Sequence, residues 1–138
     1  MANELLLDTG GLVSLLDRRQ SRHKEFVAFF EGWTGEVVST EAVLTEATHL
    51  LSRVSKGADA CLDFFLQGGA ILVPSTVTTL ARAKLLMQKY GNLPMDYADA
   101  TLVVLAEDLD IGRILTTDKR DFTVYRRNGS KRFQIRPT

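Results

Sequence analysis

The sequence is poor in the residues that build disulfides and zinc sites. It contains one cysteine, Cys61, and two histidines among 138 residues. A single cysteine allows no internal disulfide, and so few thiol and imidazole groups argue against a structural zinc site. Low cysteine content is typical of a reducing compartment, so we expect a cytoplasmic protein.

The sequence also lacks long apolar runs. No stretch of eighteen apolar residues occurs, so we expect no transmembrane helix and no membrane partner. The first residues do not form a basic region followed by an apolar run and a cleavage site, so we expect no secretory signal. The composition, 45% hydrophobic and 25% charged, is typical of a folded globular protein. Length and the absence of repeats or linkers predict a single domain over residues 1–138.

Net charge is absent as well, since 17 basic and 17 acidic residues balance. The balance is uneven along the chain. Residues 119–138 contain seven basic residues and one acidic residue, a charge of +6, and residues 1–118 carry ten minus sixteen, or −6. A basic segment of this kind can be a solvated end or can contact a polyanion such as RNA.

Short apolar runs alternate with longer stretches of helical periodicity. The runs predict strands at 4–8, 36–39, 70–74 and 113–118, and a fifth strand at the sheet edge at 133–137. Helices are expected over 14–33 with a break near Ser21, and over 40–54, 58–67, 76–90 and 95–110. The runs lack period-two alternation, which is typical of strands covered by helices on both faces. We therefore predict an α/β fold of three layers, a parallel β-sheet flanked by helices on both faces.

Acidic residues from distant parts of the chain fall at one edge of this predicted sheet. Asp8 and Asp118 end the first and fourth strands. Asp99 begins the helix that leads into the fourth strand, and Glu46 lies early in the helix after the second. The carboxyl ends of parallel strands share one edge, where ligands bind in such folds. We expect the four carboxylates to meet there.

Carboxylates at close range repel one another. Two unit charges 4 Å apart cost about 4 kcal/mol at an effective dielectric constant of about 20. A hard divalent cation, Mg²⁺ or Mn²⁺, would offset this repulsion, because these ions prefer oxygen ligands. Such an ion polarises phosphoryl oxygens and activates water. Taken singly, each acid could instead cap a helix or form a turn.

Other functions fit parts of the pattern. Asp8-Thr9-Gly10 is the triplet of aspartic proteases, but those enzymes pair two such triplets in an all-β fold, whereas the stretch after Asp8 is helical in character. A phosphoacceptor receiver domain would need a second acid beside the first strand, which the sequence lacks there. A non-catalytic module that binds RNA or protein through the basic segment stays open.

Four stretches, in this order, resemble the PIN-domain ribonucleases, and within them the VapC-type toxins of toxin–antitoxin modules. They are LLLDTGGLVSLLDRRQSRH, VVSTEAVLTEATHLL, LPMDYADATLVVLAEDL and ILTTDKRDFTVYR, and they cover nearly the whole chain. The resemblance implies a PIN-like fold and cleavage of RNA that depends on Mg²⁺ or Mn²⁺. It also implies a homodimer and a small antitoxin whose tail covers the site, and the alternative is a non-catalytic PIN-like RNA- or protein-binding module.

The resemblance also implies roles for individual residues. The family's four catalytic and metal-binding acids fall on Asp8, Glu46, Asp99 and Asp118. Thr116 corresponds to the hydroxyl that often precedes the last acid, and Asp96 and Asp121 are expected to support the site. Lys119, Arg120, Arg126 and Arg127 are expected to hold RNA phosphates. Thr9-Gly10-Gly11 differs from the polar residues that many relatives carry after the first acid, so its contribution is open.

Overall fold

Five parallel strands form the centre of the protein. The computed structural model describes residues 3–138. In the sheet the strands follow the order β3 (Ile71–Val73), β2 (Glu36–Thr40), β1 (Glu4–Leu7), β4 (Arg113–Leu115) and β7 (Gln134–Arg136). In the register, Leu6 of β1 lies opposite both Val38 and Ile114. The predicted parallel sheet, including its fifth strand at one edge, is confirmed.

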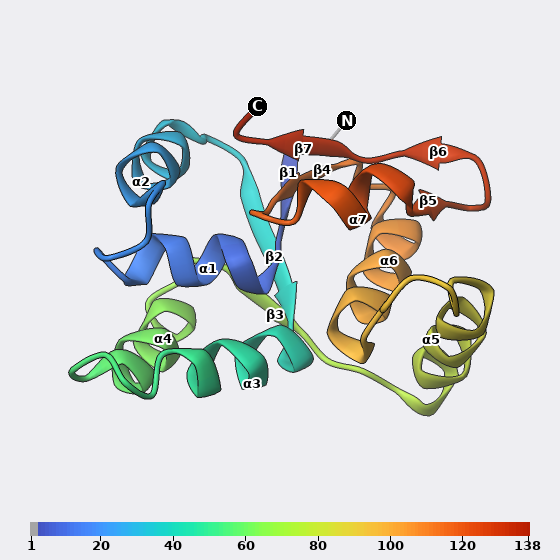
Figure 1. The fold of residues 1–138 in the computed structure, drawn as a ribbon, viewed down its shortest axis with the longest axis horizontal. Coiled ribbons are helices and arrows are strands. Elements are labelled where there is room, and N and C mark those ends of the chain that lie inside the picture. The colour runs from blue at the N-terminus through green and yellow to red at the C-terminus, as the bar shows by residue number, and fades with distance from the viewer. Residues whose placement is uncertain (1–2) are drawn as a thin grey trace.

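Seven helices cover the two faces of the sheet in the described residues. They are α1 (Thr9–Leu16), α2 (His23–Gly32), α3 (Glu41–Leu50), α4 (Gly57–Leu66), α5 (Val77–Lys89), α6 (Tyr97–Leu109) and α7 (Lys119–Val124). Figure 1 shows α1 to α4 on one side of the strands and α5 and α6 on the other. The three predicted layers are therefore present, and none of these helices is long and apolar enough to cross a membrane.

The central strand explains why the sequence shows no alternation. Leu5, Leu6 and Leu7 of β1 are all fully buried, so side chains on both faces of the strand meet helices. A strand covered on both sides must be apolar at every position. Asp8 follows Leu7 directly and is also buried. It is the first polar side chain of this segment, so the apolar core ends here, at the carboxyl edge of the sheet.

The segment after β4 differs most from the expected fold. The predicted strand at 113–118 ends at Leu115, and a short helix, α7, follows. A two-stranded antiparallel hairpin, β5 (Arg126–Arg127) and β6 (Lys131–Arg132), then precedes β7. Charged side chains dominate this segment, so hydrophobic periodicity gives no signal for either element. The helix forms because Asp118 caps its start and Phe122 is fully buried.

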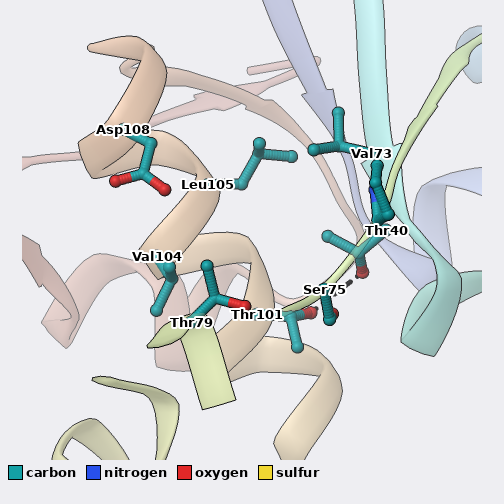
Figure 2. A pocket seen from close by; sticks show the side chains of 9 residues that line it. Thr40, Val73, Ser75, Thr79, Thr101, Val104, Leu105 and Asp108 are labelled. Atoms are coloured by element: carbon teal, nitrogen blue, oxygen red, sulfur yellow. Dashed lines mark hydrogen bonds between the residues drawn. The ribbon is translucent and has the colours of Figure 1, made fainter. Parts of the chain in front are cut away.

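A polar contact fixes α6 against the end of β2. Figure 2 shows Thr40 and Thr101 facing each other beside a small cavity, and their Oγ1 atoms lie 2.9 Å apart. Thr101 donates its proton to the carbonyl oxygen of Ala98 at 2.7 Å, so Thr40 is the donor between the two hydroxyls. The cavity, about 50 Å³, has room for ordered water. This contact holds the first turns of α6 in place.

Candidate active site

Asp8 is a buried carboxylate at the carboxyl end of the central strand. It occupies the N-cap of α1 and is 5% exposed. Its Oδ2 accepts a hydrogen bond of 2.6 Å from the Thr116 hydroxyl at the end of β4. Burial raises the pKa of Asp8 from 3.8 to about 6, and the charges of Asp118 and Glu46 add to that rise. Asp8 therefore lies close enough to both acids to interact with them.

Asp99 reaches the same edge from the first turn of α6. Asp96 caps this helix and accepts a hydrogen bond of 2.8 Å from the Asp99 backbone N–H. The Asp99 Oδ2 atom accepts a second bond, of 3.1 Å, from the Tyr125 hydroxyl. Burial raises the pKa of Asp99 from 3.8 to about 8, and the charges of Asp8 and Asp96 contribute in the same direction.

Asp118, at the start of α7, completes a group of three acids. Its Oδ1 accepts from the Asp121 backbone N–H at 3.0 Å, and its own N–H donates to the Thr116 hydroxyl at 2.9 Å. Burial raises the pKa of the Asp118 carboxyl, and the charge of Asp121 opposes its ionisation. Carboxylate oxygens of Asp99, Asp118 and Asp121 lie within 4.8 Å of one another. Asp121, expected only to support the site, thus joins Asp99 and Asp118 in this group, whereas the predicted ligands Asp8 and Glu46 are not members of it.

Glu46 reaches the site from α3. Its Oε1 accepts a hydrogen bond of 2.7 Å from the Thr9 hydroxyl, and its charge acts on Asp8. This contact answers how the triplet after Asp8 takes part, because Thr9 positions Glu46. The two glycines allow α1 to approach the end of β4 closely. A Cβ atom on Gly11 would lie 2.4 Å from the Leu115 carbonyl oxygen.

Neutral hydroxyl groups hold three of these carboxylates. Thr116 donates to Asp8, Thr9 to Glu46 and Tyr125 to Asp99. Some acids elsewhere in the described chain pair with arginine instead, as Asp17 does with Arg19. Within residues 3–138, no ion pair involves Asp8, Glu46, Asp96, Asp99, Asp118 or Asp121. Hydroxyls orient a carboxylate without cancelling its charge, so the negative potential of the site is retained.

The donor set suits a hard divalent cation. Every candidate ligand is a carboxylate oxygen, and the three clustered acids lie close enough to share one ion. Burial is the main cause of the raised pKa values of Asp8 and Asp99, and the charges of the neighbouring acids add to it, so both effects oppose ionisation of these carboxyls. An ion of charge +2 would offset the repulsion between these charges.

The four predicted phosphate-binding residues lie in different places. Lys119 and Arg120 are exposed at the start of α7, directly after Asp118. The guanidinium of Arg126 donates to three carbonyl oxygens at the end of α7, those of residues 123, 124 and 125. Arg127 is 9% exposed and pairs with Asp110 at 2.9 Å. Its guanidinium packs against Gly112, at the amino edge of the sheet, so the structure does not bring Arg127 to the site.

Sequence reasoning missed two side chains at this edge. Tyr125, which contacts Asp99, is 26 residues away in sequence, and only the fold brings them together. Arg22 lines a hollow of about 320 Å³ together with Thr116, Lys119 and the end of the chain. The sequence carries no signal for either contact, since neither residue falls at the end of a predicted strand.

Comparisons with known proteins agree with this architecture. The sequence model of the PIN domain family matches residues 5–128. The chain is 28% identical over 135 residues to Ribonuclease VapC26 of Mycobacterium tuberculosis, an alignment that covers 96% of this chain and all of the relative.

Solved structures share the fold at lower sequence identity. The crystal structure of VapC20 of Mycobacterium tuberculosis, a sarcin-ricin-loop-cleaving toxin, superposes with a TM-score of 0.79 at 19% identity, covering 84% of this chain and 91% of that one. A toxin–antitoxin complex from Klebsiella pneumoniae matches with a TM-score of 0.66 at 18% identity, covering 87% and 91%.

Proposed function

This chain belongs to the PIN domain family, and we propose that it is a metal-dependent endoribonuclease, the toxin component of a type II toxin–antitoxin system. One observation carries the proposal. Acids from four separate segments gather at the carboxyl edge of the sheet, and none of them has a basic partner within residues 3–138. Such a cluster is costly to the fold, and a cation is the ligand that offsets it. The relative VapC26 is named a ribonuclease, and VapC20 is described as a sarcin-ricin-loop-cleaving toxin.

Asp8, Asp99, Asp118 and Glu46 would hold the ion, with Asp121 beside them and Asp96 supporting Asp99. When bound, Mg²⁺ or Mn²⁺ supplies polarisation of the phosphodiester and a nucleophilic water. Thr116 restricts the rotation of the Asp8 carboxylate and at the same time accepts from the Asp118 backbone, so one hydroxyl positions two acids. The Tyr125 hydroxyl orients Asp99, and the Thr9 hydroxyl orients Glu46.

Basic side chains on one flank of the acids would hold the RNA backbone. Lys119 lines one hollow with Thr116, which contacts Asp8. Arg22 lines the same hollow, and its guanidinium pairs with Glu25 at 2.7 Å, so its contribution is smaller. Arg120 is exposed next to Lys119. Phosphates bound there would lie beside the acidic cluster without any reading of base sequence. The guanidinium of Arg126 is occupied by carbonyl oxygens, so its contribution is smaller, and Arg127 is not included.

An antitoxin and a second copy of the chain are the expected partners. The Klebsiella pneumoniae structure is a toxin–antitoxin complex, and a VapBC2 structure from Rickettsia felis, bound to promoter DNA, matches with a TM-score of 0.65 at 12% identity. For the homodimer, exposed apolar side chains follow one another from the end of α4 through β3 to α5: Leu66, Ile71, Leu72 and Val77. Exposed apolar side chains of this kind favour association. Sedimentation analysis of the purified chain, with and without Leu72→Arg, tests this surface.

The central test is cleavage of RNA by the purified chain in Mg²⁺ or Mn²⁺. We expect activity that EDTA abolishes, and loss of cleavage in Asp8→Asn with folding retained. Asp63→Asn is the matched control, because it removes one exposed acid from α4, outside the cluster. A non-catalytic binding module would bind RNA equally with and without Asp8 and would cleave none. Equal cleavage by wild type and Asp8→Asn would remove the metal site from the mechanism.

A further inference from the structure

A second hollow lies beside the acidic cluster, on the flank opposite the basic side chains. We call it the α3–α6 hollow, because the first turns of these two helices form most of its wall. It measures about 480 Å³ and its polar and aromatic lining is Glu41, Thr45, Glu46, Ser75, Asp96 and Tyr97. Binding sites for small organic groups fall in this size range.

The α3–α6 hollow is continuous with the proposed catalytic centre. Glu46 lines it and acts electrostatically on Asp8, while Asp96 lines it and holds the backbone of Asp99. A nucleotide whose phosphate sits at the acids would therefore place a neighbouring group at this hollow. No mechanistic step proposed above uses the space or its aromatic residue, Tyr97.

The charge of the lining decides which part of a nucleotide fits. Three of the lining residues are carboxylates, and none of the residues that the structure places in this wall is basic. Carboxylates repel phosphate, and when ionised they accept hydrogen bonds only. They therefore suit the amino groups of adenine, cytosine or guanine, which are donors. Phosphate binding is left to the opposite flank, where Arg22 and Lys119 lie.

Tyr97 supplies the surface on which a base would stack. It is the first residue of α6, directly after the Asp96 cap, and its side chain is 36% exposed although it is aromatic. Nucleobases stack on exposed aromatic rings in single-stranded complexes, with little dependence on sequence from the stacking itself. A base inside a duplex could not reach this ring, since both of its faces are already covered.

We propose that the α3–α6 hollow binds one unpaired nucleobase of the RNA, stacked on Tyr97 and hydrogen-bonded through its amino group to the two carboxylates of the hollow that are not proposed to hold the ion, those of Glu41 and Asp96. This inference rests on the proposed ribonuclease function and adds to it a subsite for one base beside the cut. It also assigns a preference for bases that carry an amino group over uracil at one position near the cut.

Mapped cleavage sites test the proposal. Wild type, Tyr97→Leu and Tyr97→Phe are compared on a pool of random single-stranded RNAs in Mg²⁺, and the cut ends are sequenced. We expect Tyr97→Leu to lower kcat/KM by about 5- to 150-fold, the range of one base–aromatic stack, and to lose base preference at one position only. Tyr97→Phe keeps the ring and should keep the preference. A slower Tyr97→Leu enzyme with an unchanged preference at every position overturns the inference, because a purely structural role would produce that result.

A binding measurement separates this inference from the proposed activity. Fluorescent 2′-O-methyl 12-mers resist cleavage, and an abasic site can be moved through them position by position. We expect one abasic position to weaken binding to wild type by about 5- to 150-fold and to have no effect on binding to Tyr97→Leu. If wild type binds in this way but cleaves nothing, the proposed nuclease function fails and the base site stands. If both proteins respond equally to every abasic position, the base site fails whatever the activity.

Discussion

Replacing Asp99 by asparagine tests whether the acids crowd one another as the structure indicates. The substitution removes one negative charge and keeps the shape of the side chain. The amide carbonyl oxygen of the new side chain can still accept the hydrogen bond that the Tyr125 hydroxyl donates to Asp99. In metal-free protein we therefore expect Asp99→Asn to be more stable than wild type, because ionised Asp99 is opposed by burial and by Asp8 and Asp96.

The magnitude follows from the pKa of Asp99. That pKa rises from 3.8 to about 8. A rise of about four pKa units corresponds to a destabilisation of the fold by roughly 6 kcal/mol once Asp99 is fully ionised. Asp99 is only half-buried, so solvent screening reduces the gain at pH 7 to about 2 kcal/mol. For a chain of this length such a gain raises the Tm by about 6 °C.

The sign of the pH dependence is a sharper test than the Tm itself. The folded-state pKa of Asp99 lies above its unfolded value. The contribution of Asp99 to the stability of wild type is therefore fully present below about pH 4 and is lost as the pH rises toward 8. Asp99→Asn lacks this loss. The difference in Tm between the two proteins should therefore be small near pH 4 and grow up to pH 8.

Thermal unfolding by circular dichroism in EDTA, from pH 4 to pH 8, measures this difference. Asp63→Asn serves as the control and should track wild type. Added Mg²⁺ should stabilise wild type, by about 2.7 kcal/mol at 100 times its Kd, and should stabilise Asp99→Asn less. A lower Tm for Asp99→Asn in EDTA, or a difference that does not change with pH, would refute the clustered geometry.

Four further outcomes can be measured on the same protein. Mn²⁺ affinity, followed by titration calorimetry, should increase at least about tenfold between pH 6 and pH 8, because protons on Asp8 and Asp99 compete with the ion. Thr116→Ala should weaken Mn²⁺ binding by about 10- to 100-fold and Thr116→Ser should restore it, since the Thr116 side chain acts on Asp8 through its hydroxyl; equal binding by both would contradict that role. Tyr125→Phe should weaken Mn²⁺ binding by about tenfold, by the same assay. Gly11→Ala should destabilise the fold by about 1–3 kcal/mol in urea unfolding, whereas Gly32→Ala, with open space around its Cβ position, should not.

The position of the acids could be predicted because topology alone determines it. Asp8 and Asp118 follow parallel strands, and a helix that feeds a parallel strand must begin at the same edge, which places Asp99. The partners of these acids could not be predicted in the same way. Tyr125 meets Asp99 through an aromatic cluster with Tyr90 and Phe122, whose rings lie 5.1 Å from the Tyr125 ring. Contacts of this kind depend on tertiary packing and leave no local pattern.

The basic segment shows where composition misleads. Its charge suggests one continuous contact with RNA, but β7 is parallel to β4, so the chain must return to the amino edge before Gln134. Residues that precede β7 are carried away from the acids by this return. Arg127 accordingly pairs with Asp110 beside Gly112, while Lys119 stays next to Asp118. A fifth strand parallel to β4 must begin at the amino edge of the sheet. The predicted fifth strand therefore already implied that the residues just before it lie far from the acids.

The choice of partner separates the clustered acids from the acids that form ion pairs elsewhere in the described chain. Asp17, Glu107 and Asp110 each pair with arginine, and such a pair is neutral and cannot attract a cation. The acids at the sheet edge accept from hydroxyls and backbone N–H groups, which leave the full charge in place. A basic partner for these acids would offset their charge and would compete with the ion. The site therefore keeps its affinity for a cation only because it remains a source of instability without one, and metal binding and folding stability must rise together.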